Sequence, residues 1–306
     1  MAYKMGYGKI KAHCLAKGIE IRNDEPLDRH TSLRIGGPAD MAILPQREEL
    51  PGLVKILNEE GLPFFVMGGG TNLLVRDGGV AGVVLFTTSL QGLEVQGQRI
   101  LVDAGVPLQK LLGHAANHGL SGMEGLAGIP GTVGGAIFGN AGSYGCEIGE
   151  AVVTLKIISE GRIRTMEKKE ASFRYRGSGI PSEAVLISAV LSLREGDPQE
   201  IRERIKGFLL EKRSKQPVSF ASAGCVFKNP EGITAGRLID EAGCKGMRMG
   251  AIEVSAVHAN FFVNTGRGTA CDFLRLMDEV TERVIRKTGI ILEPEVRIIG
   301  SEREIQ

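Results

Sequence analysis

The sequence contains no tryptophan and few other aromatic residues, with 11 Phe and 4 Tyr among 306 residues. It also lacks an excess of charge of either sign, because 37 Lys and Arg face 36 Asp and Glu. A net charge of +1 provides none of the broad basic surface typical of nucleic-acid-binding proteins, so we expect no nucleic-acid partner. Hydrophobic residues make up 42% of the chain, which argues against intrinsic disorder.

Cysteine is scarce and irregularly spaced. The five cysteines, none of them in a Cys-X-X-Cys pair, are Cys14, Cys146, Cys225, Cys244 and Cys271. An odd number without paired spacing argues against a disulfide framework and against a four-cysteine zinc site. A reduced setting fits this pattern, and we therefore expect a cytoplasmic protein.

Long apolar segments are missing as well. The first 18 residues, MAYKMGYGKIKAHCLAKG, include no apolar core of signal-peptide length, so we expect no export. Residues 125–146 carry no charge, but eight of them are glycine, and each glycine costs a helix about 1 kcal/mol relative to alanine. We therefore expect no membrane-spanning helix and no membrane partner.

The common catalytic and nucleotide-binding motifs are also absent. No Gly-X-Ser-X-Gly elbow, no Gly-X-Gly-X-X-Gly fingerprint and no P-loop Gly-Lys-Ser/Thr occurs. His114 and His118 have the spacing of a zinc-binding helix, but Ala115 stands where a glutamate base would be needed. With no third ligand in sight, we expect no metal.

Glycine, in contrast, is abundant, with 43 residues or about twice the usual share. Six glycines lie within 68–82, and a second set recurs at every third position from Gly119 to Gly134 and continues to Gly145. Pro130 is the only proline among those triplets, which argues against collagen, and the interleaved apolar residues argue against a flexible linker.

These clusters predict a nucleotide whose phosphates are bound by backbone. Glycine lets N–H groups approach an anion closely and adopt the positive φ that forms an anion-binding nest. The first cluster follows an expected strand at 63–67 and precedes further strand patterns at 73–75 and 80–86. We therefore expect a glycine turn between strands, which differs from a Rossmann fold.

The length of 306 residues predicts about two domains, and hydrophobic periodicity predicts a mixture of helices and strands, an α+β chain. Helices are expected at 47–60, 107–118, 234–242 and 269–288, and from Pro198 to near Lys215. Strands are expected at 83–87, 93–103, 152–158, 162–166, 185–193, 225–227, 259–264 and 296–299. Asp197 before Pro198 is typical of a helix start, and Thr269 with Asp272 forms a capping pattern.

Three further segments hold reactive side chains: residues 172–178 (SFRYRGS), 221–230 (ASAGCVFKNP) and 293–300 (EPEVRIIG). Taken singly, each has an ordinary explanation: the first is a solvated strand edge, the second holds a small buried cysteine, and the third places Glu295 in a salt bridge. Together with the glycine clusters they closely resemble the UDP-N-acetylenolpyruvoylglucosamine reductases, in the same order along the chain. The segments that carry the resemblance are 68–85, 128–145, 173–178, 223–230 and 292–300, and residues 30–40 and 257–264 also fit.

The resemblance runs from about residue 20 to the C-terminus. It implies an α+β fold with an N-terminal segment (1–33), an FAD-binding domain of the vanillyl-alcohol-oxidase type (34–197) and a smaller α+β substrate-binding domain (198–306). It also implies that NADPH reduces a non-covalently bound FAD, which then passes a hydride to the enolpyruvyl methylene carbon of UDP-N-acetylglucosamine enolpyruvate. The product, UDP-N-acetylmuramate, serves peptidoglycan synthesis, and the family suggests a monomer.

Carried over by position, the resemblance places the catalytic arginine on Arg176, the acid that protonates C2 on Cys225, and the catalytic glutamate on Glu295. It implies flavin contacts at Gly68, Gly69, Gly70, Thr71, Asn72, Gly131, Thr132, Gly134, Gly135, Asn140, Ala141 and Gly142. The family's acid is more usually serine, so Cys225 is a departure. The connection from Ser178 to Val185 is too short for the tyrosine lid of the longer branch, which identifies the shorter branch. Substrate contacts are then expected from Tyr175, Lys215, Lys228 and Asn229.

The residue types suit this chemistry. A guanidinium at Arg176 can stabilise a developing enolate through charge-assisted hydrogen bonds. A thiol ionises near pH 8.5, so Cys225 would hold a proton to donate at neutral pH. Glu295 either orients the substrate carboxylate in protonated form or holds the arginine in ionised form. Two alternatives remain: an FAD-dependent alcohol or sugar oxidase or dehydrogenase, and a non-catalytic nucleotide- or flavin-binding module.

Overall fold

The computed structural model describes residues 3–302, with side chains from residue 7 onward. Contacts divide the chain into two compact units, and each unit is assembled from separate segments. The first comprises residues through Asn23, Met41–Gly69 and Gly82–Leu210, and the second comprises Asp24–Asp40, Gly70–Ala81 and the chain from Glu211 onward. The two units therefore alternate along the sequence. The expected consecutive domains, an FAD-binding domain at 34–197 and a substrate-binding domain at 198–306, stay a prediction.

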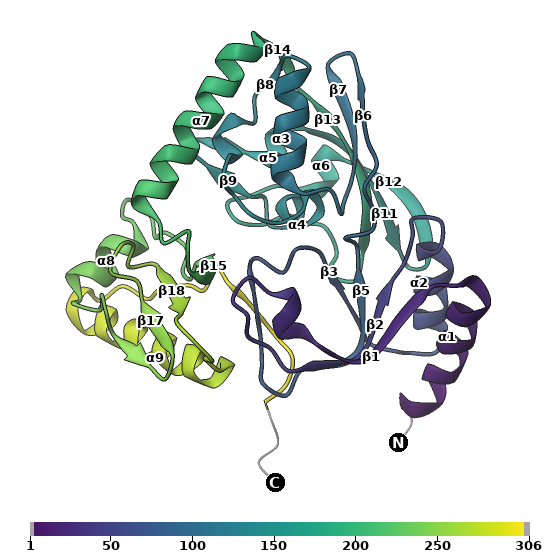
Figure 1. Cartoon of the computed structure of the whole chain (residues 1–306), viewed down its shortest axis with the longest axis horizontal. Coiled ribbons are helices and arrows are strands. Elements are labelled where there is room, and N and C mark those ends of the chain that lie inside the picture. Colours follow the sequence, from purple (N-terminus) through teal and green to yellow (C-terminus); the bar gives the residue numbers. More distant parts are fainter. Residues whose placement is uncertain (1–2, 303–306) are drawn as a thin grey trace. The chain divides into compact units, whose positions relative to one another are not determined.

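The first unit contains a five-stranded antiparallel sheet of order β12-β11-β13-β7-β6 (Figure 1). Its strands are β6 (Leu93–Gln96), β7 (Arg99–Asp103), β11 (Val152–Ser159), β12 (Arg162–Glu167) and β13 (Val185–Ser192). Short strand pairs accompany it: β8 (Leu120–Ser121) with β14 (Arg194–Glu195), and β9 (Gly142–Ser143) with β10 (Cys146–Glu147). The helices of this region are α3 (Leu108–Asn117), α4 (Val133–Phe138), α5 (Ile148–Ala151) and α6 (Lys168–Ala171).

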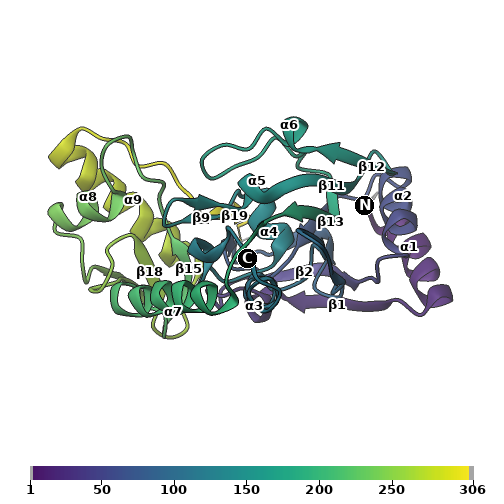
Figure 2. The ribbon, with the colours of Figure 1, turned by 90° about the horizontal axis from the view of Figure 1, so that it is seen from above.

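A second, four-stranded sheet has the order β1-β2-β5-β3. Its members are β1 (Glu20–Pro26), β2 (Pro38–Leu44), β5 (Val80–Phe86) and β3 (Phe64–Met67), and β3 runs parallel to β5. Helices α1 (Tyr3–Lys17) and α2 (Leu50–Glu59) lie side by side (Figures 1 and 2). The glycine cluster after β3 leads to strands rather than to a helix, which confirms the predicted turn.

The second unit is built on an antiparallel sheet of order β15-β18-β17-β16. These strands are β15 (Ala221–Cys225), β16 (Arg248–Met249), β17 (Ile252–Val254) and β18 (Phe261–Asn264), and the helices are α8 (Ala235–Glu241) and α9 (Ala270–Thr288). Strand β19 (Arg297–Ile299) pairs in parallel with β4 (Leu73–Val75). Phe262 and Phe273 are fully buried, with ring centroids 5.3 Å apart, and form the centre of this unit's core.

Helix α9 begins with the predicted capping box. Thr269 Oγ1 accepts from the Asp272 N–H, and the Asp272 carboxylate accepts from the Thr269 N–H. Asp77 adds a second cap from a distant part of the chain, because its two carboxylate oxygens accept from the N–H groups of Ala270 and Cys271 at 2.9 and 3.0 Å. The helix start is therefore fixed by the 70–81 segment as well as by its own sequence.

Two predicted strands were wrong in detail. The expected strand 93–103 is a hairpin, because Gly97 takes a φ of 58° and Gln96 pairs with Arg99 across a two-residue turn. The expected strand 225–227 lies at Ala221–Cys225 instead, with a register shift before Cys225 and a φ of 78° at Gly224. Helix α1 and strands β1 and β2 had no clear periodic signal.

No helix within residues 3–302 is long and apolar enough to cross a membrane.

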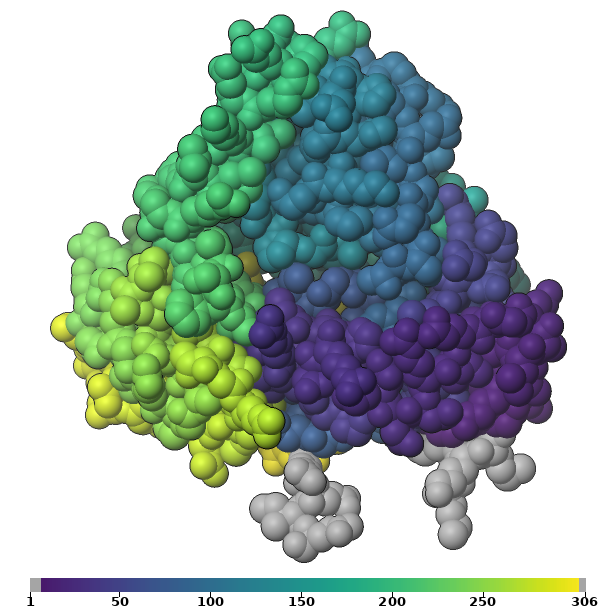
Figure 3. Space-filling view, viewed as in Figure 1, coloured from purple at the N-terminus to yellow at the C-terminus, as the bar shows by residue number. Residues whose placement is uncertain are grey.

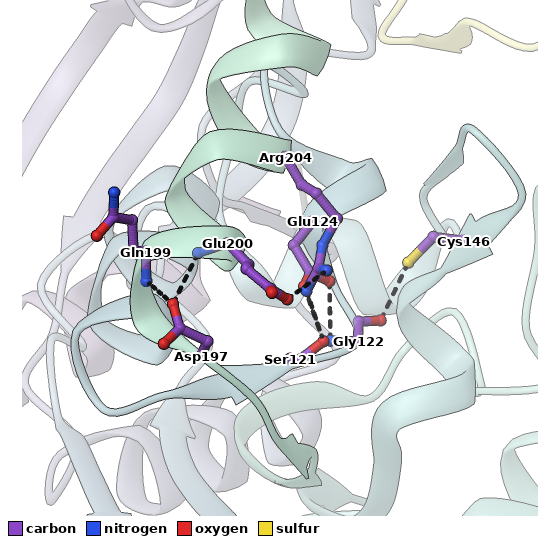
Figure 4. A network of polar contacts seen from close by, with 8 residues as sticks. All are labelled: Ser121, Gly122, Glu124, Cys146, Asp197, Gln199, Glu200 and Arg204. Carbon is purple, nitrogen blue, oxygen red and sulfur yellow. Dashed lines mark hydrogen bonds and ion pairs between the residues drawn. The ribbon is translucent and has the colours of Figure 1, made fainter.

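Helix α7 (Pro198–Lys215) starts where the sequence predicted. Asp197 Oδ1 accepts from the N–H groups of Gln199 and Glu200 at 2.7 and 3.0 Å (Figure 4). Along the next turns most side chains are exposed, and Figure 3 shows them in green on the outer surface. A partly buried contact attaches the helix to the first unit, because Arg204 Nη2 donates to Glu124 Oε1 at 2.8 Å.

The Glu124 carboxylate is the centre of this contact. Its side chain is 10% exposed, and it also accepts from Ser121 Oγ and from the Gly122 N–H, both at 2.8 Å. Burial alone would raise its pKa, but the hydrogen bonds from Arg204, from the backbone and from Ser121 together lower it below the ordinary 4.5. Nearby, burial raises the pKa of Cys146 to about 11, and its thiol donates to Gly122 O.

A lowered pKa makes the contribution of Glu124 to stability pH-dependent. The contribution is complete above about pH 4.5 and is lost as the pH falls through the lower pKa of the folded state. We predict that Glu124→Gln lowers the free energy of unfolding by about 1–2 kcal/mol at pH 7, discounted because Arg204 is partly exposed. Urea unfolding between pH 7 and pH 3.5 should show the difference from wild type shrinking at the acid end.

Glu200→Gln is the matched control, since Glu200 reaches the same arginine only at 3.9 Å and is 71% exposed. It should change stability little at any pH. A deficit in Glu124→Gln that stays constant down to pH 3.5 would contradict the lowered pKa.

Candidate active site

The two predicted glycine clusters meet in the first unit. A Cβ on Gly68 would lie 2.4 Å from Thr132 Oγ1, and a Cβ on Gly69 would lie 3.0 Å from Gly131 Cα. Real Cβ atoms do not tolerate the first distance and rarely the second. The absence of a side chain lets Gly68 lie against the Thr132 hydroxyl and Gly69 against the Gly131 backbone, so the structure brings these four predicted residues together.

Several N–H groups of the second cluster are used by the fold. Val133 and Gly134 donate to the carbonyls of Val106 and Ala104 at 2.9 and 2.8 Å, and Gly135 donates to Thr132 Oγ1 at 3.4 Å. Gly128 and Ile129 also donate internally, and Pro130 has no N–H. Within residues 128–135, the backbone N–H groups that remain as candidate phosphate donors are those of Gly131 and Thr132.

Asn140 and Ala141 tie the end of this cluster to the following segments. Asn140 is fully buried with a φ of 45°, and its side chain bonds to Glu147, to Arg174 O and to the Gly149 N–H. Ala141 donates its N–H to Ala136 O at 2.7 Å. These two predicted flavin contacts are therefore engaged with the protein itself.

Arg176 lies beside the same cluster. Its Nη1 is 3.3 Å from the place where a Cβ on Gly142 would stand, so the glycine leaves room for the guanidinium. The Arg176 Cζ also lies 5.0 Å from the centre of the Tyr175 ring, a cation–π geometry. The predicted catalytic arginine and a predicted cofactor-binding glycine are therefore neighbours.

The backbone at Arg176 is unusual. Arg174 and Gly177 exchange two N–H···O bonds of 3.0 Å, which makes Tyr175 and Arg176 the central residues of a tight turn. Arg176 has a φ of 54°, in the left-handed region where such turns normally place glycine. Holding a non-glycine residue there costs about 1–2 kcal/mol, and such strain is concentrated at functional sites.

In the second unit the structure brings Cys225 and Glu295 onto neighbouring backbone segments. Cys225 is the last residue of β15, where the register shift and Gly224 form a bulge that turns the strand end. The next residue, Val226, accepts from the Glu295 N–H at 2.8 Å, and Phe227 bridges to Pro294. The two predicted catalytic side chains thus belong to one local framework.

Asn72, a predicted cofactor residue, belongs to this framework too. Its Nδ2 donates to Glu295 O at 3.1 Å, and its own carbonyl accepts from the Arg297 N–H at 3.0 Å. The two other predicted cofactor residues of this unit are Gly70 and Thr71, directly before Asn72. Gly70 has a φ of 59°, and its carbonyl accepts from the Ser32 N–H at 3.1 Å.

The four predicted substrate contacts have different surroundings. Tyr175 is 47% exposed on its turn. Lys215, near the end of α7, pairs with Glu211 at 2.7 Å, and Lys228 pairs with Glu293. Asn229 Oδ1 accepts from the Ala235 N–H at 3.0 Å, at the start of α8.

Some residues that support this framework were not singled out from the sequence. Asn260 is 1% exposed and bonds both ways to the Phe227 backbone, at 2.9 and 2.7 Å, which fixes the segment after Cys225. Ser32 Oγ donates to Ser222 O at 2.7 Å. Both lie in segments, 30–40 and 257–264, that the family resemblance had marked without assigning any residue a role.

Metal ligands do not gather in the part of the chain that the structure describes, where no group of three or more His, Cys, Asp or Glu residues could hold an ion. The rings of His114 and His118 lie 4.5 Å apart on α3 and at its end. Burial and the neighbouring His118 lower the pKa of His114.

Comparison with known proteins gives matches over both parts of the chain. Residues 39–167 match a family of FAD binding domains, and residues 216–299 match the C-terminal domain of UDP-N-acetylenolpyruvoylglucosamine reductase. These matches, with the sheets described above, confirm the predicted α+β fold in which an FAD-binding domain precedes a smaller domain.

Curated relatives match over most of their length. The UDP-N-acetylenolpyruvoylglucosamine reductase of Rubrobacter xylanophilus is 45% identical over 90% of this chain and 94% of its own, and that of Geobacter metallireducens is 44% identical over 97% and 98%. The crystal structure of the Thermus caldophilus reductase superposes with a TM-score of 0.79 at 36% identity, covering 92% of this chain and 98% of that one. The chain therefore belongs to the UDP-N-acetylenolpyruvoylglucosamine reductase family.

Proposed function

We propose that this chain is the FAD-dependent enzyme that reduces UDP-N-acetylglucosamine enolpyruvate to UDP-N-acetylmuramate for peptidoglycan synthesis, with NADPH as the electron donor. The observation that carries the proposal most directly is the shared framework of Cys225, Glu295 and Asn72. A proton donor, a carboxylate and part of a glycine-rich cofactor loop are held there by direct backbone bonds.

The glycine clusters fit the proposed flavin. Gly68 and Gly69 meet Gly131 and Thr132 so closely that a side chain at Gly68 would clash and one at Gly69 would force its neighbour to move. Because neighbouring N–H groups of residues 128–135 donate within the protein, the N–H groups of Gly131 and Thr132 are the donors best suited to a diphosphate. When bound, FAD supplies the hydride for the substrate, and NADPH restores it.

Arg176 supports the charge that develops on the substrate. Adding a hydride to the methylene carbon of an enolpyruvyl ether leaves negative charge on C2 and on the carboxylate. A guanidinium held in one place by a tight turn stabilises that charge through paired hydrogen bonds, without having to reorganise during the reaction. The strain at Arg176 is consistent with a position kept for its side chain rather than for its backbone.

Cys225 then donates a proton to C2. The bulge at Gly224 sets the direction of the thiol at the end of β15. Glu295 holds the reacting carboxylate or the arginine in place. The substrate diphosphate is gripped by the ammonium groups of Lys215 and Lys228 and by Asn229 and Tyr175, in place of a tyrosine lid.

The remaining assignments follow the family. The flavin domain is residues 34–197 and the substrate domain is residues 198–306, after an N-terminal segment of residues 1–33. The matched ranges 39–167 and 216–299 fall within those two domains. The enzyme works as a monomer in the cytoplasm, where its nucleotide substrates are found.

The decisive experiment follows the colour of the bound flavin. In a stopped-flow instrument, NADPH should bleach the flavin absorbance, and UDP-N-acetylglucosamine enolpyruvate should restore it under anaerobic conditions. A protein purified without flavin absorbance would refute the proposal. So would a protein whose reduced flavin is not reoxidised by this substrate and whose oxidised flavin is instead reduced by a sugar alcohol.

The acid role of Cys225 can be tested by two substitutions. Cys225→Ser keeps a hydroxyl proton and should retain activity within about tenfold, whereas Cys225→Ala should lose about 10²–10⁴-fold. Reduction of the flavin by NADPH should be intact in both, since no proton from residue 225 is needed there. If Cys225→Ala turns over at the wild-type rate, the proton comes from elsewhere.

The strain at Arg176 predicts a trade between stability and activity. Arg176→Gly and Arg176→Ala both remove the guanidinium, so both should slow flavin reoxidation by the substrate about 10²–10³-fold. Glycine adopts the φ of 54° without strain, whereas alanine does not. The free energy of unfolding of Arg176→Gly should therefore be about 1 kcal/mol higher than that of Arg176→Ala. Equal stability in urea for the two variants would show that the turn is unstrained.

A further inference from the structure

We propose that Asn140 is a positioning residue that acts in the reaction through Arg176, by fixing the tight turn that carries the guanidinium. Its role rests on the proposed function, in which Arg176 stabilises the developing enolate. This assignment replaces the direct flavin contact that the family resemblance implied for Asn140.

Hydrogen bonds on both sides of the turn at Tyr175 and Arg176 attach it to the rest of the first unit. On its entry side, Arg174 O accepts from Asn140 Nδ2 at 2.9 Å. On its exit side, Ser178 Oγ donates to Phe138 O at 2.8 Å. Both hydrogen bonds lead to residues 138–140 of the second glycine cluster. This stretch comes just before Gly142, the glycine that lies next to Arg176 Nη1.

The Asn140 side chain is fully committed to the protein. Its amide nitrogen has two hydrogens, and these go to Arg174 O and to Glu147 Oε2, the latter at 2.6 Å. Its Oδ1 accepts from the Gly149 N–H at 3.0 Å, and the residue is 0% exposed. The backbone N–H donates to Ile137 O at 3.1 Å. No donor of Asn140 is left for a cofactor.

The partners also fix which way the amide faces. A backbone N–H can only donate, so Gly149 requires the oxygen, while a carbonyl and a carboxylate can only accept, so Arg174 and Glu147 require the nitrogen. Aspartate at this position would present no donor to either acceptor. An asparagine is therefore matched to these three partners by chemistry as well as by size.

The Asn140 side chain links the β9–β10 strand pair, which lies beside the Arg176 guanidinium, to the turn that carries Arg176. Glu147 stands opposite Gly142 in the β9–β10 pair, with its Cγ 2.9 Å from the place where a Gly142 Cβ would lie. Asn140 thus joins the strand pair that gives the guanidinium its space to the turn that supplies it. Because Arg176 sits in an unfavourable φ region, losing this bond should let the turn relax and shift the guanidinium. A shift of about 1 Å in such a group can slow a reaction about 10²-fold.

The test is a double-mutant cycle on the FAD-loaded protein, with Asn140→Gly, Arg176→Ala and their combination. Glycine accepts the φ of 45° at position 140, so the substitution removes the side-chain bonds without adding backbone strain. We expect Asn140→Gly to slow flavin reoxidation by UDP-N-acetylglucosamine enolpyruvate about 10–100-fold in the wild-type background, and less than about threefold in Arg176→Ala. Flavin reduction by NADPH should stay within about threefold.

A second measurement does not depend on the flavin or on turnover. Hydrogen–deuterium exchange of the peptide that contains residues 173–178 reports on the two backbone bonds of the turn. Exchange there should be at least about tenfold faster in Asn140→Gly than in wild type. Asn140→Asp tolerates the same φ and keeps the volume, and it should behave in the same way if the glycine variant folds poorly.

Asn264→Ala is the matched control. Asn264 is also buried and makes three side-chain hydrogen bonds, to Leu33 O and from the N–H groups of Gly266 and Gly268. Its loss should lower the free energy of unfolding but leave exchange at 173–178 and the reoxidation rate near those of wild type.

The outcomes separate this role from the alternatives. A loss of bound FAD, a slowed reduction by NADPH, or equal slowing in both backgrounds would make Asn140 a flavin contact and overturn the proposal. Wild-type reoxidation and wild-type exchange in both Asn140 variants would overturn it as well. If the wild-type flavin is not reoxidised by the substrate at all, the proposed function fails, while the exchange result still decides whether Asn140 holds the turn.

Discussion

The structure depends on how closely two backbones can approach. Gly68 lies against the Thr132 side chain and Gly69 against the Gly131 main chain, so closely that a side chain at Gly68 would clash and one at Gly69 would require its neighbour to move. Glycine is costly in regular structure because it loses the most conformational freedom on folding. At this contact the cost is offset, because glycine backbone offers N–H groups to a ligand without side chains in the way.

The side chains proposed to react are carried by frameworks of a different kind. Arg176 is carried by a turn whose conformation suits glycine, and Cys225 ends a strand that a bulge redirects. Neither arrangement would form from local preference alone. Each is held by polar bonds from residues far away in the sequence, Asn140 in the first case and Asn260 in the second. Buried asparagines are well suited to this task, because one side chain offers both donors and acceptors to irregular backbone.

Much of the fold was predictable from local chemistry. The helix starts at Asp197 and Thr269 were found because a capping side chain and its partner lie within three residues of each other. The predicted strand 93–103 was wrong because a single glycine, Gly97, was enough to turn the chain back in a hairpin. Similarly, the bulge at Gly224 moved β15 upstream of its predicted place.

The proposed catalytic positions were available only through ordered motifs, since an arginine between a tyrosine and a glycine has no periodic signal. The supporting residues were less visible still. Asn140 and Arg174 are separated by 34 positions, and Asn260 and Phe227 by 33, so no local pattern connects them. The left-handed φ of Arg176 could not be anticipated either, because sequence reasoning reserves that region for glycine.

The cap that Asp77 places on helix α9 has a consequence for how this protein can be divided. Residues 70–81 lie between two stretches of the first unit, yet they supply β4 to β19 and two hydrogen bonds to the start of α9. The C-terminal part is therefore not a module that a gene fusion could carry elsewhere by itself. Severed near residue 211, it would expose an unpaired parallel strand and a helix without its distal cap. Recombination between distant relatives would have to keep residues 70–81 matched to the C-terminal part that they support. The two units are therefore expected to be inherited together.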